Sequence, residues 1–177
     1  MATSCPLTLV GLSRNCDPNI GGIVRAWFGK YGQFNITPVE SAHTISAITA
    51  VSGATDAKFY EYEFARQTGS ITSEYTTDAS TDVRYYTNTA NLQFSRMEAN
   101  KHVELEALGM GELIGIFEDA NHNFWVIGVD NPLTAASQTA QSGQAFSDLN
   151  GYQTSFSAMS GHLPYKTTFA AFSGLIG

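Results

Sequence analysis

The chain has 177 residues, a length typical of one folded domain, so we expect a single domain over residues 1–177. Charged residues make up 14% of the sequence, well below the roughly 25% of ordinary soluble domains, so much of the surface must be neutral and polar. Such a surface loses little desolvation energy when another protein covers it, which favours assembly. A net charge of -7, with nine scattered Lys and Arg residues, argues against a nucleic-acid-binding protein.

The start of the sequence carries no secretory signal, and no apolar run reaches the length of a membrane span. We therefore expect a protein that is made in the cytoplasm and does not contact a membrane. In that reducing compartment Cys5 and Cys16 are expected to be free, buried thiols in preference to a disulfide. Further along, the two glycines of Asn19–Val24 predict a tight bend before the first strand.

Alternating apolar and polar residues predict a series of β-strands. They are expected at Ile23–Tyr31, His43–Val51, Lys58–Arg66, Gly69–Thr77 and Val83–Met97, with a turn or exposed tip at Thr77–Asp82. In the second of these strands, a period of two places Ile45 on one face and Ser46 and Ile48 on the other.

The third strand, Lys58–Arg66, has the clearest alternation. Its aromatic residues Tyr60, Tyr62 and Phe64 should share one face, and Glu61 and Glu63 the other. The glutamate face is interpreted as a polar exterior, with the lining of an acidic channel as the alternative.

One segment departs from the period of two. Ser95–Met110 has Met97, Val103, Leu105 and Leu108 near helical spacing, and a glycine where a helix would end. We predict a single helix there.

The segment Gly111–Pro132 predicts two apolar strands joined by a polar turn. The turn residues Asp119, Asn121 and Asn123, with Asp130 beyond them, match part of a calcium-binding loop. Phe124 stands where that loop needs glycine, so an Asx-type turn without metal is the preferred interpretation.

The last third of the chain predicts more sheet. In Leu133–Gly161 a turn around Asp148, Asn150 and Gly151 precedes a strand with alternating Tyr152, Thr154, Phe156 and Ala158. The final residues, 167–177, are apolar enough to dock on the body of the protein or on a neighbour. The whole pattern predicts a mainly β fold, an antiparallel β-sandwich or small barrel with one flanking α-helix.

The residues that carry chemistry form no recognisable constellation. The four histidines lie in four different segments, the cysteines have no close partner, and neither a nucleophile elbow nor a phosphate-binding loop is present. We therefore expect no catalytic residue, no cofactor and no metal, and a protein that is not an enzyme.

Four segments, in order, carry a resemblance to a known family. They are "CPLTLVGLSRNCDPNIGGIVRAWF" (Cys5–Phe28), "KFYEYEFARQTGSITSE" (Lys58–Glu74), "IGIFEDANHNFWVIGVDNPL" (Ile114–Leu133) and "TAQSGQAFSDLNGYQTSFSAMSGHLPY" (Thr139–Tyr165). In this order the chain resembles virion proteins of tailed bacteriophages and prophages, especially of Bacteroides-type hosts, that are related to tail-tube and tail-ring subunits.

The resemblance implies a structural virion protein, present in the phage tail and assembled in the host cytoplasm. Its subunits would join sheets edge to edge into rings, commonly hexameric, and stack into a tube through which genomic DNA passes unbound during ejection. An N-terminal arm (1–22), the Gln67–Thr89 hairpin with its long loop, and the segment Leu133–Gly151 would contact neighbouring copies and other tail proteins.

Candidate site residues follow from this resemblance. The channel-lining candidates are Glu61 and Glu63. The candidates for inter-subunit contact are Cys5, Cys16, Tyr85, Tyr86, Asp148, Asn150 and Tyr152. Alternatives are a tail ring, connector or terminator protein, or a surface carbohydrate-binding β-sandwich whose groove would use Tyr85, Tyr86 and Trp125.

Overall fold

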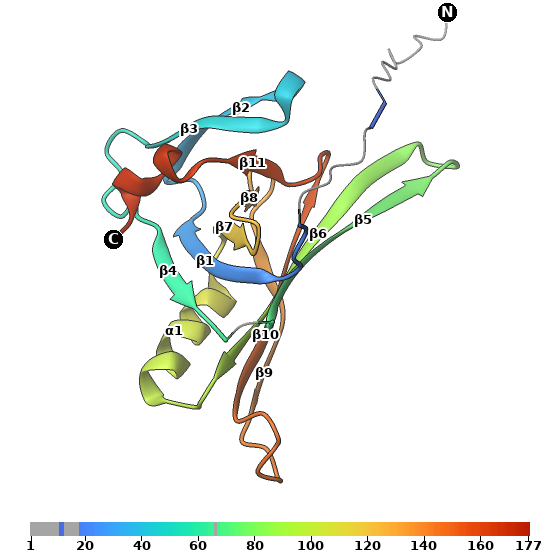
Figure 1. The fold of residues 1–177 in the computed structure, drawn as a ribbon. Coiled ribbons are helices and arrows are strands. Elements are labelled where there is room, and N and C mark those ends of the chain that lie inside the picture. Colours follow the sequence, from blue (N-terminus) through green and yellow to red (C-terminus); the bar gives the residue numbers. More distant parts are fainter. Residues whose placement is uncertain (1–10, 13–17, 66) are drawn as a thin grey trace, which may run out of the picture.

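The protein is a mainly β sandwich with one α-helix among the residues that the computed structural model describes, which are 11–12, 18–65 and 67–177 (Figure 1). This confirms the predicted fold class. The strands are β1 Ile23–Lys30, β2 Phe34–Val39, β3 Thr44–Ala50, β4 Tyr60–Glu63, β5 Gly69–Asp78, β6 Val83–Ser95, β7 Leu113–Asp119, β8 Phe124–Ile127, β9 Thr134–Gln141, β10 Gly151–Ser160 and β11 Tyr165–Thr167. The helix is α1 Ala99–Met110, and short 3-10 turns are η1 Glu40–Ala42, η2 Phe169–Ala171 and η3 Ser173–Leu175.

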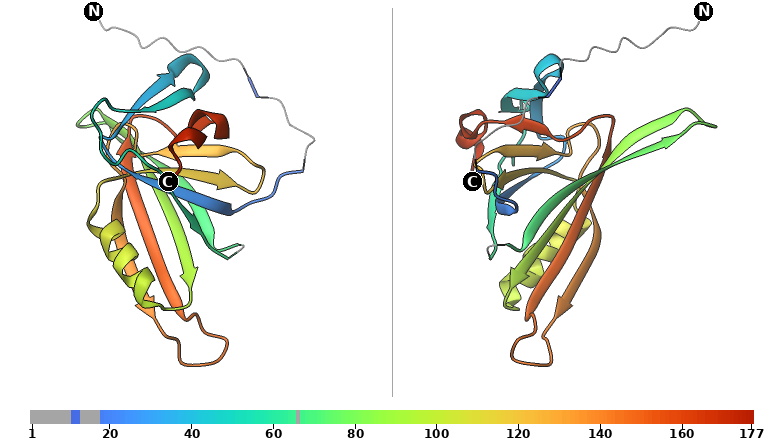
Figure 2. Two further views of the ribbon diagram at one scale, coloured as in Figure 1. Left: turned by 90° about the vertical axis from the view of Figure 1, so that its left-hand side faces the viewer. Right: turned by 45° about the vertical axis from the view of Figure 1, so that its right-hand side comes forward.

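The strands form two sheets of unequal size. The larger sheet has the order β2-β3-β11-β8-β7-β1-β4, and the smaller has the order β5-β6-β10-β9. Pairing is antiparallel except between β11 and β3, which meet in parallel at Lys166 and Thr44. The two sheets face each other, and α1 closes the space between them at one end (Figure 2).

The main core lies between the sheets and is built on aromatic rings. Phe28 of β1 contacts Phe117 of β7 edge to face, with ring centroids 5.6 Å apart, and Phe156 of β10, with ring centroids 5.0 Å apart. Leu105 and Leu108 of α1 complete this cluster. Because successive strand residues point to opposite faces, the alternation Tyr152–Ala158 puts one whole side of β10 into this core, as predicted.

A second core covers the far face of the larger sheet. Trp27, fully buried, packs edge-on against Phe172 with ring centroids 5.4 Å apart. The C-terminal turns are held there by backbone hydrogen bonds from Phe59 N–H to Leu175 and from Gly177 N–H to Phe59. The apolar C-terminal segment therefore docks on its own subunit, one of the two outcomes that its composition predicted.

The strict alternation predicted for Ile45 and Ile48 is wrong, because both side chains are buried in the second core. The register between β2 and β3 shifts between Thr37 and Pro38, so Ser46 is an extra, exposed residue in β3. The extra residue of a β-bulge shifts the alternation of faces by one residue in the rest of the strand. Ile48 therefore points to the same face of the sheet as Ile45.

The predicted helix forms, but it starts later than expected. Ser95 is the last residue of β6, and α1 begins at Ala99 after Arg96, whose φ of 65° reverses the chain. Lys101 Nζ donates to the carbonyl oxygens of Ser95 and Arg96 and ties the helix to this turn. Val103, predicted on the apolar side of the helix, is 69% exposed.

Two hairpins of the smaller sheet extend beyond the sandwich at opposite ends (Figures 1 and 2). At one end, the tip of β5–β6 turns at residues 79–82, where Asp78 accepts hydrogen bonds from the backbone and hydroxyl of Ser80. At the other end, the loop 142–150 joins β9 to β10. The outer half of β5 is exposed along its whole length, as is nearly all of β9.

Candidate assembly surfaces

The edges of the two sheets differ in how they are protected against pairing with another chain. In the larger sheet, edge strand β2 contains Pro38 at its bulge, and edge strand β4 has only four residues, two of them Glu61 and Glu63. Proline, bulges, short strands and charges are the devices by which proteins block their edge strands. Both edges of the larger sheet therefore carry features that disfavour pairing with another strand.

The edges of the smaller sheet are longer and contain no proline. Its edge strand β9 has eight residues without a charge or a proline, and the uncharged sequence runs from Asn131 to Ser147. The opposite edge strand β5 has ten residues. Gln138 Nε2 donates to the carbonyl oxygen of Leu105 and anchors β9 to α1 on its inner side. The β5 edge carries Glu74 and Asp78, and the register of β9 against β10 shifts between Ser155 and Phe156. Of the four sheet edges, β9 is therefore the longest one that lacks both charge and proline, the devices that most directly hinder pairing with another strand.

The outer face of the smaller sheet is polar but almost free of ions. The register of its strands places on this face the polar residues Ser70, Thr72, Glu74, Thr76, Asp78, Thr87, Thr89, Asn91, Gln93, Ser137, Thr139, Gln153, Ser155 and Ser157, together with Tyr85 and Met159. All four strands together contain three charged residues, Glu74, Asp78 and Arg84. A monomer that kept this face in water would ordinarily mix charges of both signs over it.

Glu61 and Glu63 lie on the other sheet. In β4, Tyr62 points into the main core, and Glu61 lies beside Trp27 on the far face of the larger sheet. Glu61 Oε1 is 3.4 Å from Arg25 Nη1 in a partly exposed ion pair. The predicted separation of the tyrosine and glutamate faces of β4 is thus confirmed. The glutamates lie on the outer face of the larger sheet, on the opposite side of the sandwich from the outer face of the smaller sheet.

Arg25 also pairs with Glu118, a residue that the sequence did not single out. The Arg25 Nε group donates to Glu118 Oε2 at 2.7 Å, and His122 Nδ1 lies 2.9 Å from the other carboxylate oxygen. Burial raises the pKa of Glu118, but the hydrogen bonds from His122 and Arg25 outweigh it and hold the pKa below its ordinary value. The side chain is 3% exposed and stays ionised at neutral pH.

The β7–β8 turn is held by Asp119. Its carboxylate accepts hydrogen bonds from the backbone N–H groups of Asn121 and Asn123 and from the indole Nε1 of Trp125 at 3.0 Å. Burial raises the pKa of Asp119, and these hydrogen bonds lower it by more. The preferred interpretation, an Asx-type turn, is confirmed. In residues 11–12, 18–65 and 67–177, no three His, Cys, Asp or Glu side chains are placed to hold a metal ion.

The residues predicted to contact other subunits are scattered over the fold. Cys5 and Cys16, with most of the predicted arm 1–22, lie outside the described residues. Tyr85 and Tyr86 are neighbours on β6, so they face opposite sides of the sheet and cannot line one groove. Tyr86 packs against Tyr75 with ring centroids 5.1 Å apart.

The polar residues around the β9–β10 loop form hydrogen bonds within their own subunit. Asp148 Oδ2 accepts the backbone N–H groups of Gln144 and Ala145, and Asn150 accepts the N–H groups of Arg96 and Met97. Tyr152 is 2% exposed in the main core. A side chain buried this deeply offers no surface to a neighbour, so the prediction of an inter-subunit contact is wrong for Tyr152.

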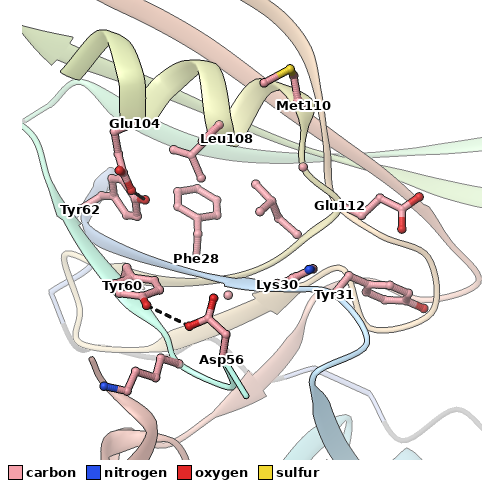
Figure 3. A pocket seen from close by; sticks show the side chains of 15 residues that line it. Phe28, Lys30, Tyr31, Asp56, Tyr60, Tyr62, Glu104, Leu108, Met110 and Glu112 are labelled. Atoms are coloured by element: carbon pink, nitrogen blue, oxygen red, sulfur yellow. Dashed lines mark hydrogen bonds between the residues drawn. The ribbon is translucent and has the colours of Figure 1, made fainter. Parts of the chain in front are cut away.

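A groove of about 450 Å³ runs between α1 and the edge of the larger sheet (Figure 3). Its floor is apolar, formed by Phe28, Leu108 and Leu113. Around its rim, Tyr60 donates to Asp56 at 3.1 Å and Tyr62 donates to Glu104 at 2.5 Å. Burial and the hydrogen bond to Glu104 raise the pKa of Tyr62, so its hydroxyl stays protonated.

Two histidines that are far apart in the sequence meet at the surface. His43 stacks on Tyr165 with ring centroids 4.5 Å apart, and its Nε2 lies 2.9 Å from the carbonyl oxygen of Leu163. His162 approaches Glu40, which also accepts a hydrogen bond from Tyr165. Burial and this hydrogen bond raise the pKa of Tyr165 to about 12. The positions of these histidines in the sequence did not predict the cluster, because it forms only through contacts between distant segments of the chain.

The open end of the sandwich forms a second hollow, which we call the wedge. It has a volume of about 400 Å³ and lies between the start of β5 and the β7–β8 turn. Its walls include Ile20, Ile71, Asn121, Trp125, Leu163 and Pro164. Ile20 is 59% exposed and Leu163 is 46% exposed, so the wedge presents apolar side chains to solvent.

In the described part of the chain, no helix is both long and apolar enough to cross a membrane. Comparisons of the chain with protein-family models, with curated proteins and with solved structures find no match.

Proposed function

We propose that the protein is a structural subunit that joins copies of itself edge to edge through the smaller sheet, forming a ring around a channel. The observation that carries this proposal is the contrast between the two sheets. The edges of the larger sheet carry Pro38, Glu61 and Glu63, whereas β9 has eight residues without a charge or a proline. This contrast favours pairing through the smaller sheet.

Pairing β5 of one copy with β9 of the next makes a head-to-tail contact that closes when the rotation between copies completes a circle. Backbone groups that each edge leaves to water then find partners in the ring. The outer face of the smaller sheet becomes the channel wall, a surface mainly of hydroxyl and amide groups that also carries the carboxylates of Glu74 and Asp78 and the side chains of Tyr85 and Met159. In this arrangement Glu61 and Glu63, the channel-lining candidates of the sequence, lie on the larger sheet and face away from the channel.

Such a wall suits the passage of DNA. Phosphates bind proteins chiefly through Lys and Arg, and the four strands contain a single basic residue, Arg84, near the hairpin tip. A channel wall without Lys or Arg side chains does not bind phosphates, so DNA would pass along the channel without being retained. Together with the resemblance of four ordered segments to tail proteins, this supports a tail-tube subunit of a tailed bacteriophage, with rings that are commonly hexameric in the proteins it resembles.

A tail ring, connector or terminator uses the same edge pairing but does not repeat along the tail. The distinction rests on whether rings stack on themselves. In either case the partners are copies of this chain and other tail proteins, the location is the virion, and DNA passes without specific binding.

The test is the assembly state of the purified full-length chain, measured by light scattering after gel filtration and by electron microscopy. We expect rings or tubes. The double variant Ala136→Lys/Thr139→Lys puts charges on β9 and should give monomers with an unchanged circular dichroism spectrum. The matched variant Asn35→Lys/Thr37→Lys on β2 should assemble normally. A wild-type chain that stays monomeric at high concentration would reject the proposal.

A carbohydrate-binding β-sandwich is the second candidate, and the groove in Figure 3 favours it. Tyr60 and Tyr62 stand beside Asp56 and Glu104, a combination of aromatic rings and carboxylates that suits a sugar. The corresponding test is a glycan array with the wild-type chain and with Tyr60→Ala. Binding that the variant loses, by a chain that remains monomeric, would favour this candidate over the ring.

A further inference from the structure

Helix α1 has apolar residues on two opposite faces. On its inner face, Leu105 and Leu108 are buried in the main core. Its outer face carries a second apolar line, whose members follow one another every three or four residues and therefore lie along one side of the helix. This line, which we call the outer stripe, consists of Ala99, Val103, Ala107 and Met110. Val103 is 69% exposed and Met110 is 85% exposed.

The subunit itself leaves the outer stripe uncovered. A helix at a protein surface ordinarily has one apolar face, which packs on the core, and one polar face in water, whereas a helix that is apolar all round is buried. Figure 3 shows Leu108 pointing from α1 toward Phe28, and Met110 pointing away from it. The outer stripe is therefore an apolar surface in the place where a surface helix is ordinarily polar.

The groove beside α1 enlarges this apolar surface. Ala107 and Met110 of the outer stripe also line the groove, whose floor is formed by Phe28, Leu108 and Leu113. The twelve residues of the helix span about 18 Å at roughly 1.5 Å per residue. An apolar stripe of this length beside a groove is the kind of surface on which an amphipathic helix docks, with side chains one turn apart as its anchors.

The charges beside the outer stripe are negative. Glu104 and Glu106 flank it on either side, since successive helix residues are turned by about 100°, and Glu112 follows the end of α1. In the part of the chain that the structure describes, none of these three carboxylates forms an ion pair. Carboxylates that border an apolar surface and have no cation of their own are complementary to the Lys or Arg side chains of a partner.

The cations of this region lie elsewhere. Arg96 and Lys101 are both paired with Glu98 at the start of α1, at 3.0 Å and 3.3 Å. Lys30 and Lys58 line the groove from the side of the larger sheet. The helix side of this surface therefore keeps its negative charge.

We propose that the outer stripe and the adjoining groove bind an amphipathic helix of a different protein. The apolar face of that helix packs on Val103, Ala107 and Met110, and Lys or Arg residues beside this face meet Glu104 and Glu106. A second copy of this chain does not fit this description. Its one α-helix among the described residues, α1, would bring the same carboxylates against each other, and its nine Lys and Arg residues are scattered along the sequence. The contact does not depend on the strand pairing of the proposed ring.

The test is the binding of a fluorescently labelled synthetic peptide to the full-length chain, measured by fluorescence anisotropy. The peptide has about 14 residues, with Leu every three or four positions and Lys elsewhere, so that it forms a basic amphipathic helix. A shuffled peptide of the same composition lacks the apolar face, and a third peptide has Glu in place of Lys. We expect only the first peptide to bind, and to bind more weakly as the salt concentration rises.

A double variant locates the peptide on α1. Val103→Ser/Met110→Ser should lower the affinity by about tenfold or more, because two apolar contacts are lost. The matched control is Val83→Ser/Met159→Ser, which changes an exposed valine and an exposed methionine of the smaller sheet and should keep the affinity within about twofold. Both variants should keep the circular dichroism spectrum of the wild-type chain.

A second double variant tests the charges. Glu104→Gln/Glu106→Gln should lower the affinity for the peptide and make it less dependent on salt. Glu74→Gln/Asp82→Asn removes the same net charge from the β5–β6 hairpin and should leave the affinity almost unchanged. An equal loss in these two variants would mean that the peptide responds only to the net charge of the chain, which would overturn the proposal.

Further results would also overturn the proposal. A wild-type chain that binds none of the peptides, or that binds the shuffled peptide equally well, has no docking surface for a basic helix. Equal losses in Val103→Ser/Met110→Ser and its control would reject the placement on α1. If light scattering shows that Val103→Ser/Met110→Ser no longer forms rings, the outer stripe is a contact between copies. A glycan that binds the wild-type chain but not this variant, without peptide binding, would assign the surface to a sugar.

Discussion

Arg25 on β1 donates a hydrogen bond from Nε to Oε2 of Glu118 on β7 at 2.7 Å, and its guanidinium lies 5.2 Å from the centre of the Trp27 ring. The arginine thus lies at the boundary between a buried carboxylate and the second core. Glu118 is 3% exposed, while Arg25 is 39% exposed. The ion pair is therefore partly protected from solvent, and removing one partner leaves a buried charge with fewer hydrogen bonds.

We predict that Arg25→Met lowers the free energy of unfolding by about 1–2 kcal/mol, the range for a hydrogen bond to a charged group reduced for the exposure of Arg25. The measurement is urea unfolding followed by tryptophan fluorescence, since Trp27 is fully buried. Arg84→Met is the control, because Arg84 and Asp82 form a pair with side chains 64% and 85% exposed, and it should have little effect. Equal losses in the two variants would contradict the prediction.

Stability should fall in acid because of the β7–β8 turn. The pKa values of Glu118 and Asp119 are both below their ordinary values in the folded chain. A group with a lowered folded pKa stabilises the fold above its unfolded pKa, about 4 for these residues, and loses this contribution as pH falls through the folded pKa. The urea midpoint should therefore drop steeply below about pH 4. In Asp119→Asn this acid slope should be shallower; an unchanged slope would refute the assignment.

Gly151 is predicted to be intolerant of a side chain. A Cβ there would lie 2.1 Å from the carbonyl oxygen of Phe94, because β6 and β10 meet closely at this point. Gly151→Ala should lower the free energy of unfolding by about 3 kcal/mol or more through backbone displacement. Gly161→Ala, which meets no atom within 4 Å, should be nearly neutral. Thermal unfolding of both variants measures the difference, and a stable Gly151→Ala protein would show the crowding to be wrong.

Phe172 fixes the C-terminal segment over the second core. It is 1% exposed and packs on Trp27, Phe59 and Phe124. Phe172→Ala should cost about 3–5 kcal/mol, the range for removing a buried phenylalanine. The neighbouring Phe169 is 45% exposed, so Phe169→Ala should cost clearly less. Limited proteolysis should release the C-terminus faster in the first variant only; release at equal rates would contradict this assignment.

Local periodicity was sufficient to predict most elements of this fold. Tyr152, Thr154 and Phe156 alternate with exposed or half-buried residues and are all buried, as their spacing indicated. The turn at Asp119 could also be predicted, because Asp and Asn side chains form hydrogen bonds with backbone groups only a few residues away. These features depend on neighbours in the chain, so the sequence by itself determined them.

Tertiary structure decided which faces are covered and which edges remain open. Glu118 is buried because Arg25 reaches it from another strand, and His43 meets His162 through the pairing of β3 with β11. Ile48 turns inward only because a bulge shifts its register against β2. Strand order assigned β9 to an open edge and placed Glu61 on the opposite sheet. Such contacts join residues far apart in the chain, and local spacing carries no information about which distant segments meet.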